Sequence, residues 1–149
     1  MELILWRHAE AEDDAAGGDM ARALTRRGKK QAERMGEWLA ARISDEWLVL
    51  SSPAKRAVQT AKGLAMRFEE RDALAPGASA AAILREAGWP SGKRPVVIVG
   101  HQPTLGEAAA KILGVRGDVG IRKAALWWFA AKDATATLRC VLDPDLVEQ

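Results

Sequence analysis

The sequence predicts an α/β domain with three layers, in which a mostly parallel central sheet carries helices on both faces. Short apolar runs such as 3–6 and 96–99 are typical of strands buried in a parallel sheet. Segments with apolar residues at helical spacing separate these runs, and such alternation is typical of α/β architecture. The length of 149 residues suits one domain, so residues 1–149 are predicted to form a single unit.

The predicted strands are short apolar or alternating segments bounded by turn residues. In chain order they cover residues 2–6, 47–50, 95–100, 124–130 and 136–142. The last of them alternates apolar and polar side chains and contains the single cysteine, Cys140. We expect this cysteine to be a packing residue rather than a nucleophile.

The predicted helices combine helical apolar spacing with residues that favour helix ends. In chain order they cover residues 25–42, 53–68, 79–87 and 103–113. Thr25 and Ser79 are favoured N-caps, and Pro53 stands where a first-turn proline is favoured. Gly114 is a favoured helix terminator. The polar segment 9–23 is predicted to be an irregular loop between the first strand and the first helix.

Composition and charge exclude several classes of partner. The formal net charge of +2 is too small to predict nucleic-acid binding. One basic cluster, at 26–30, is either a solvated helix face or a positive rim that attracts phosphorylated partners. No apolar stretch approaches the ~18 residues that a membrane span needs. Glu2 stands where a signal peptide would carry basic residues, so a cytoplasmic location is expected.

The only two histidines, His8 and His101, each follow an apolar run. Open α/β sheets bind ligands beyond the carboxyl ends of their strands, so both imidazoles are expected at one site. Arg7 precedes the first histidine, and Arg56 lies in the first turn of the helix predicted after the second strand. These four side chains predict a basic pocket for a dianion, because guanidinium groups donate in a planar fork that matches phosphate oxygens.

Such a pocket can support phosphoryl transfer. A neutral imidazole is a competent nucleophile toward phosphorus, and nearby arginines lower its pKa and keep it neutral. His8 is therefore the candidate nucleophile, while Arg7, Arg56 and His101 are candidates for stabilising the transferred group. No cofactor is expected. No metal site is expected either, because two histidines and one cysteine supply zinc ligands poorly.

Four pieces of the sequence resemble the signature of the histidine phosphatase superfamily, and within it the small bacterial SixA-type phosphohistidine phosphatases. They are RHAEA at 7–11, LTRRG at 24–28, SSPAKRAVQT at 51–60 and VGHQP at 99–103.

The resemblance implies a phosphoglycerate-mutase-like fold without a cap. It also implies that His8 is the phosphorylated nucleophile and that His101 is the second histidine of the pocket. Arg7 and Arg56 would hold the phosphate. Arg22, Glu10 and Gln102 are candidate substrate-binding residues.

The chain departs from the family pattern at the general acid. Many members carry an acidic proton donor between the second arginine and the second histidine, and the comparable turn here, 76–79, has no carboxylate. An imidazole leaving group depends less on such an acid than an alkoxide does, because its pKa is about 6.5. The departure therefore favours phosphohistidine over sugar phosphates. Glu10, Asp13 and Asp14 remain candidate donors if loop 9–23 folds over the pocket.

The expected substrate is phosphohistidine on a protein. The short spacing between Arg56 and His101 leaves no room for the cap that encloses small substrates in larger relatives, so an open site is expected. The expected partner is a histidine phosphorelay or phosphotransfer protein, with no nucleic-acid or membrane partner. Two alternatives stay open, a general small-molecule phosphomonoesterase and a non-catalytic phosphoprotein-binding module.

Overall fold

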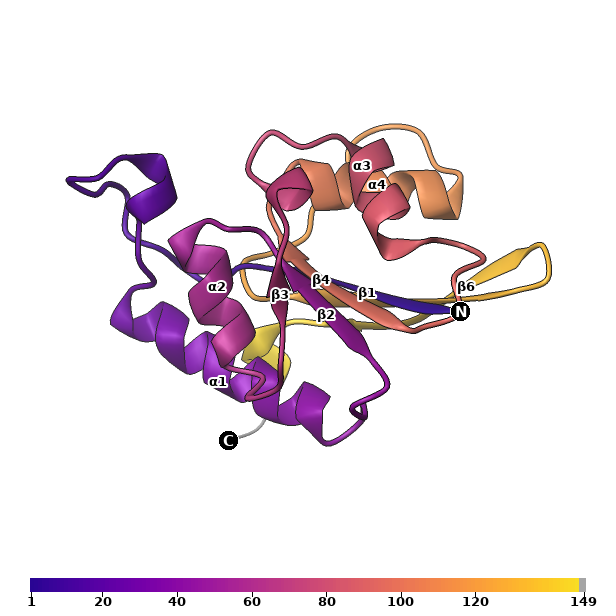
Figure 1. Cartoon of the computed structure of the whole chain (residues 1–149), viewed down its shortest axis with the longest axis horizontal. Helices are drawn as coiled ribbons and strands as arrows, with labels where there is room; N and C mark the ends of the chain where they lie inside the picture. The colour runs from indigo at the N-terminus through magenta and orange to yellow at the C-terminus, as the bar shows by residue number, and fades with distance from the viewer. Residues whose placement is uncertain (148–149) are drawn as a thin grey trace.

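A six-stranded mixed sheet lies between two pairs of helices in the computed structural model, which describes residues 1–147 (Figure 1). The strands are β1 (Glu2–Arg7), β2 (Leu48–Ser51), β3 (Glu69–Glu70), β4 (Val96–Gly100), β5 (Leu126–Lys132) and β6 (Thr135–Leu142). The α-helices are α1 (Arg26–Ala40), α2 (Lys55–Lys62), α3 (Ala80–Ala87) and α4 (Thr104–Leu113). This arrangement confirms the predicted three-layer α/β fold.

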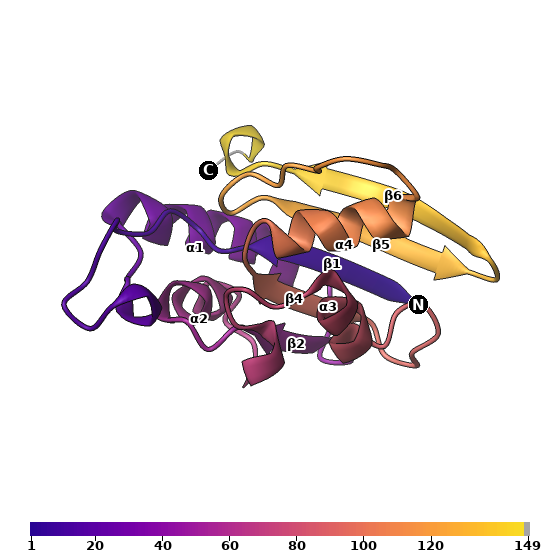
Figure 2. The same cartoon turned by 90° about the horizontal axis from the view of Figure 1, so that it is seen from above.

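The strand order is β3-β2-β4-β1-β5-β6, so β1 lies inside the sheet between β4 and β5. Figure 2 labels all of these strands except β3. The strands β1 to β4 run parallel to one another, and β5 and β6 add an antiparallel edge beside β1. In the register between β1 and β4, Arg7 pairs with Gly100. The residues that follow these two strands, His8 and His101, therefore emerge side by side at the carboxyl edge of the sheet.

The core consists of two apolar layers, one on each face of the sheet. Side chains alternate along β1 because successive residues of a strand point to opposite faces. Ile4 and Trp6 pack in the layer under α1 and α2, whereas Leu3 and Leu5 pack in the layer under α3 and α4. All four are fully buried. The helix pairs thus cover opposite faces of the sheet (Figure 1), and the strand ends between them are left for the site.

Helix ends follow the predicted caps. The side chain of Thr25 accepts a hydrogen bond from the amide of Gly28, and Ser79 does the same for Ala82. Gly114 ends α4 in the left-handed conformation, with φ of 66°. Among residues 1–147, no helix combines the length and the apolar character that a membrane span requires.

Two expectations about the middle of the chain were wrong. Helix α2 begins at Lys55 rather than at Pro53, because the side chain of Ser52 binds the amide of Ala54 and keeps the preceding residues in a bend. It also ends at Lys62, well before Phe68. The chain leaves the helix there at a glycine that packs against the backbone of α1, and it continues into β3, which was not predicted. Both residues of this strand are exposed and neither is apolar, so no sequence pattern marks it.

Candidate active site

The two histidines meet at the carboxyl edge of the sheet, as predicted. The amide of His8 donates a hydrogen bond of 3.0 Å to the carbonyl of Gly100, which joins the ends of β1 and β4. The ring centroids of His8 and His101 lie 5.2 Å apart. Both residues are buried, with exposed fractions of 7% and 6%. Two imidazoles at this separation can contact one tetrahedral anion.

The ring of His8 has a fixed orientation and a fixed tautomer. Its Nδ1 atom lies 2.7 Å from the carbonyl oxygen of Ala9, and because a carbonyl only accepts, Nδ1 carries the hydrogen. Burial lowers the pKa of His8 to about 4; the bond to Ala9 opposes this shift. The positive charges of Arg56, Arg7 and Arg22 lower the pKa further. At neutral pH the ring is therefore uncharged, and Nε2 holds a free lone pair.

His101 is held from the opposite side of the pocket. Its Nε2 atom lies 2.8 Å from Oγ of Ser52, and that oxygen also accepts a hydrogen bond from the amide of Ala54. Burial is the main cause that lowers the pKa of His101; the neighbouring imidazole of His8 and the charge of Arg56 also lower it, Asp19 opposes them, and the pKa falls to about 3. This ring is also neutral at pH 7.

Both predicted arginines are held by protein oxygens on one side of the guanidinium. Nη1 of Arg7 donates to the carbonyl of Ile121 at 2.9 Å. Nη1 of Arg56 donates to the carbonyl of Asp19 at 2.9 Å, and its Nη2 donates to the Asp19 carboxylate at 3.2 Å. Burial lowers the pKa of each arginine, and for Arg56 the charge of Asp19 opposes this shift.

Three buried nitrogen atoms have no hydrogen-bond partner within the part of the chain that the structure describes. They are Nε of Arg7, Nε of Arg56 and Nδ1 of His101. Buried polar groups are nearly always paired, so a cluster of exceptions calls for a ligand. All three belong to residues that sequence analysis assigned to one pocket, and N–H groups of this kind suit phosphoryl oxygens. The local chemistry therefore fits a bound oxyanion.

Arg22 reaches the pocket indirectly, through a residue that sequence analysis did not single out. Its Nε atom donates to the Asp19 carboxylate at 3.0 Å, and its Nη1 atom donates to the carbonyl of Glu12 at 2.9 Å. The other carboxylate oxygen of Asp19 binds Arg56. Asp19 was missed because it lies in the irregular loop 9–23, where no periodicity marks a functional position. Its only local signal is the spacing of three residues before Arg22.

The remaining candidates lie farther from the two imidazoles. The carboxylate of Glu10 accepts a hydrogen bond of 2.8 Å from the hydroxyl of Thr25, at the start of α1. Asp13 and Asp14 are exposed in the loop. The side-chain amide of Gln102 binds backbone groups of α4 and of the loop before β5. The structure thus brings together His8, Arg7, Arg56 and His101, and it leaves these four polar residues outside that group.

The turn compared with the family's acidic loop lies near the pocket. The carbonyl of Ala78 accepts a hydrogen bond of 2.7 Å from Oγ1 of Thr104, the first residue of α4, which follows His101 closely. The turn therefore lies at the same edge of the sheet, and none of its residues, 76–79, carries a carboxylate. Between residues 1 and 147, His, Cys, Asp and Glu side chains form no group of three or more that could hold a metal ion.

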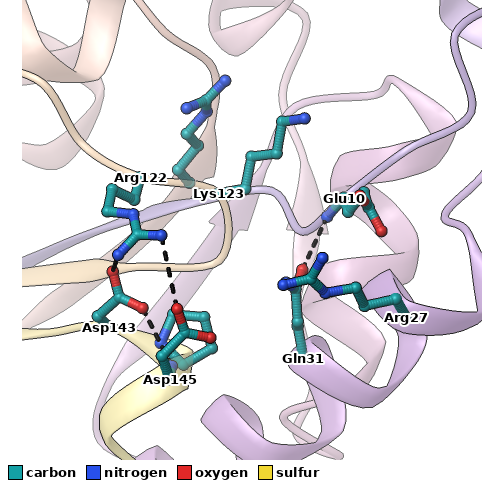
Figure 3. Close-up of a pocket in the computed structure, with 9 residues that line it drawn as sticks. Glu10, Arg27, Gln31, Arg122, Lys123, Asp143 and Asp145 are labelled. Atoms are coloured by element: carbon teal, nitrogen blue, oxygen red, sulfur yellow. Dashed lines mark hydrogen bonds and ion pairs between the residues drawn. The ribbon is translucent and has the colours of Figure 1, made fainter.

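A polar groove of about 350 Å³ extends from Arg7 along the surface (Figure 3). One wall comes from α1, and the other comes from the segment before β5 and from the turn after β6. Arg122 is tied to Asp143 and Asp145 on that second wall. The groove is lined by Arg7, Glu10, Arg27, Gln31, Arg122, Lys123, Asp143, Pro144 and Asp145.

Comparison with known proteins identifies the family. The model of the histidine phosphatase superfamily (branch 1) matches residues 3–77. The phosphohistidine phosphatase SixA homolog of Haemophilus influenzae is 31% identical over 141 residues, which covers 85% of each chain.

Solved structures show the same fold over nearly the whole length. A SixA protein from Agrobacterium tumefaciens superposes with a TM-score of 0.80 at 25% identity, covering 96% of this chain and 97% of that one. A SixA protein from Nakamurella multipartitia gives a TM-score of 0.75 at 26% identity, covering 96% and 95%. The chain therefore belongs to the histidine phosphatase superfamily and is a phosphatase of the SixA type.

Proposed function

We propose that this phosphatase removes the phosphoryl group from phosphohistidine on a protein, through a covalent intermediate on His8. One observation carries the proposal: a neutral imidazole with a free Nε2 lone pair lies beside His101 and within reach of the charges of Arg7 and Arg56, and three buried nitrogens of these residues have no partner among residues 1–147. Arg7, Arg56 and His101 supply those nitrogens. This is the donor set that an in-line phosphoryl transfer needs, because such reactions depend on positioning and on charge stabilisation.

In the first step, Nε2 of His8 attacks phosphorus and the bond from phosphorus to the substrate imidazole breaks. The substrate ring, already protonated by solvent on its other nitrogen, keeps the bonding pair and leaves as neutral imidazole. The Nε groups of Arg7 and Arg56 bind the equatorial oxygens while charge is redistributed. We assign the Ser52 hydroxyl as the donor to Nε2 of His101, 2.8 Å away, which leaves the ring hydrogen on Nδ1 for donation to the same phosphoryl group.

In the second step, water attacks the phosphorus bound to His8. The bond from phosphorus to Nε2 breaks, inorganic phosphate leaves and the neutral imidazole is restored. The first step sets the substrate preference, because no carboxylate stands at 76–79 to protonate a leaving group. An alkoxide without an acid would leave more slowly by about 10² to 10⁴. An imidazole, with a pKa of about 6.5, does not need one.

A protein substrate is supported by the surface around the pocket. Arg7 also lines the polar groove described above, and the other side chains that line it include Arg27 and Lys123, which Figure 3 shows. A histidine presented on another protein brings neighbouring residues that this groove can contact, whereas a small metabolite offers little beyond its phosphate. The name of the Haemophilus relative, phosphohistidine phosphatase, points to the same substrate class.

The intermediate is tested by rapid quenching with substrate that carries a radiolabelled phosphoryl group. The label is expected on His8, labile in acid and stable in alkali, and the His8→Ala variant is expected to retain none. Label on Cys140 or on a serine would contradict the mechanism. If the unmodified protein binds the phosphoprotein without releasing phosphate, it is a binding module instead.

The substrate class is tested by comparing kcat/KM on a phosphohistidine protein, on phosphoimidazole and on sugar phosphates. We expect the two compounds with a P–N bond to be preferred by about 10² or more, the factor that a missing general acid imposes on alkoxide leaving groups. A preference for sugar phosphates would instead identify a general phosphomonoesterase.

A further inference from the structure

Asp19 connects two arginines that come from different parts of the chain. One carboxylate oxygen lies 3.2 Å from Nη2 of Arg56 and the other lies 3.0 Å from Nε of Arg22. Its backbone carbonyl accepts a third hydrogen bond, from Nη1 of Arg56. We propose that Asp19 is a positioning residue that holds the outer edge of the Arg56 guanidinium, so that the Nε edge faces the phosphoryl group. This inference rests on the proposed function, and it assigns a role to a residue that the proposed reaction steps do not use.

The geometry of the guanidinium explains why holding one edge presents the other. The group is planar and offers five N–H donors in fixed directions. One edge is formed by Nη1 and Nη2, and Asp19 takes both of these atoms in Arg56, through its carbonyl and its carboxylate. The adjacent edge is formed by Nε and the second hydrogen of Nη2. Nε is the buried atom of Arg56 that has no partner among the described residues.

Arg7 shows the same arrangement with a different support. Its Nη1 is held by the carbonyl of Ile121 and its buried Nε is again unpartnered among residues 1–147. The two arginines therefore present equivalent edges, one fixed by backbone alone and the other by a side chain from loop 9–23. Because Asp19 binds the edge adjacent to the one that phosphate would use and leaves Nε and the second hydrogen of Nη2 free, its carboxylate orients the arginine without taking these donors from the phosphoryl group.

The loop around Asp19 is built to fix its position. Gly18 adopts a φ of 92°, which suits glycine, and starts the short 3-10 turn Asp19–Ala21. Arg22 closes this turn and anchors it to the carbonyl of Glu12. The side chain of Asp19 is 59% exposed, so it adds little to the buried core.

The negative charge of Asp19 fits a positioning role and excludes a role as the general acid. Partial desolvation would raise the pKa of its carboxyl group, but the hydrogen bond from Arg22 and the charge of Arg56 outweigh this effect, and the pKa is lowered. The carboxylate is therefore ionised at neutral pH and can hold both guanidinium groups. An ionised carboxylate has no proton to give, so Asp19 does not replace the missing general acid.

The test compares Asp19→Ala and Asp19→Asn with the wild type, and uses Asp14→Asn as a matched control from the same loop. The readouts are kcat and KM on phosphoimidazole, together with the dissociation constant of vanadate, which mimics five-coordinate phosphorus. Asp19→Ala is expected to lower kcat about tenfold and to weaken vanadate binding by a similar factor, with a smaller change in KM, because a loosened donor matters most in the transition state. Asp19→Asn, which keeps an oxygen acceptor, is expected to lose less, and Asp14→Asn to match the wild type.

A double-mutant cycle separates positioning from a general effect on the fold. If Asp19 acts through Arg56, then Asp19→Ala in an Arg56→Ala background causes no further loss of kcat. An equal loss in both backgrounds would overturn the proposal. So would wild-type kcat, or tighter vanadate binding, in Asp19→Ala, since tighter binding would show that the carboxylate competes with phosphate.

The vanadate measurement keeps this inference separate from the proposed function. If the wild-type protein turns over none of the substrates, the proposed function fails. In that case weaker vanadate binding by Asp19→Ala still supports the positioning role, and unchanged binding overturns it. Thermal midpoints only slightly below that of the wild type are expected for Asp19→Ala and Asp19→Asn, because the Asp19 side chain is 59% exposed although its ion pair with Arg56 is lost.

Discussion

Acidification from pH 7 to pH 5 is expected to destabilise this protein through its two buried histidines. The unfolded chain takes up a proton on each imidazole near the ordinary pKa of 6.5. The folded protein does so only near pH 4 for His8 and near pH 3 for His101. At pH 5 the unfolded state therefore binds more protons than the folded state, and the free energy of unfolding falls as the pH falls.

The size of the effect follows from the difference between the ordinary histidine pKa and the lowered pKa values in the folded protein. One pKa unit corresponds to about 1.4 kcal/mol, so each histidine lowers the free energy of unfolding by about 2 kcal/mol between pH 7 and pH 5. The two together remove about 3 to 4 kcal/mol, a large part of the roughly 5–15 kcal/mol that stabilises a typical domain. With a urea dependence of about 2 kcal/mol per molar, the unfolding midpoint should drop by about 2 M.

The assay is urea unfolding at pH 7 and at pH 5, followed by tryptophan fluorescence in buffers that contain no phosphate, since a bound anion would stabilise the folded state. The control is the double variant His8→Gln, His101→Gln, whose amides do not titrate. This variant is expected to lose most of the pH dependence, and the lowered carboxyl pKa of Asp19 accounts for part of any remainder. Equal wild-type midpoints at the two pH values, or an undiminished drop in the double variant, would refute the reasoning.

Three further predictions concern the pocket, the groove and the packing of two helices. Arg56→Lys should lower kcat/KM on phosphoimidazole by about 10², because a point charge replaces a planar fork; activity equal to that of the wild type would contradict this. Lys123→Glu should reduce kcat/KM on a phosphohistidine protein more than on phosphoimidazole, and an equal reduction on both would remove the groove from substrate recognition. Gly36→Ala should destabilise the fold by about 2 kcal/mol in urea unfolding, because the new Cβ would lie 2.0 Å from the carbonyl oxygen of Gly63; an unchanged midpoint would show that α1 and α2 can separate freely.

The parts of the fold that the sequence predicts well are those where one local signal dominates. The apolar runs that became β1 and β4, and the caps at Thr25 and Ser79, each follow from a few neighbouring residues. The end of α2 could not be predicted in this way. It depends on the close approach of Gly63 to the backbone of α1, which is a tertiary contact that leaves no periodic trace.

The same distinction applies to the site, where residues at strand ends could be predicted and loop contacts could not. Strand ends and a helix start placed His8, His101 and Arg56 correctly, because parallel strands bring their carboxyl ends to one edge. Asp19 was missed, and the contacts of the Gln102 side chain were not predicted, for one reason. Their roles depend on which way an amide or a carboxylate points within a loop, and that direction is set by partners 37 and 17 residues away in the chain.

The central position of β1 has a consequence for how the protein becomes active during synthesis. This strand leaves the ribosome before both of its neighbours in the sheet, β4 and β5, which are made from residues 96–132. A nascent chain that lacks those residues has no template on which to order its first strand, and long-range strand pairing of this kind is slow. Phosphatase activity should therefore arise only when the last third of the chain has emerged, so enzyme turnover reports on completed assembly of the sheet.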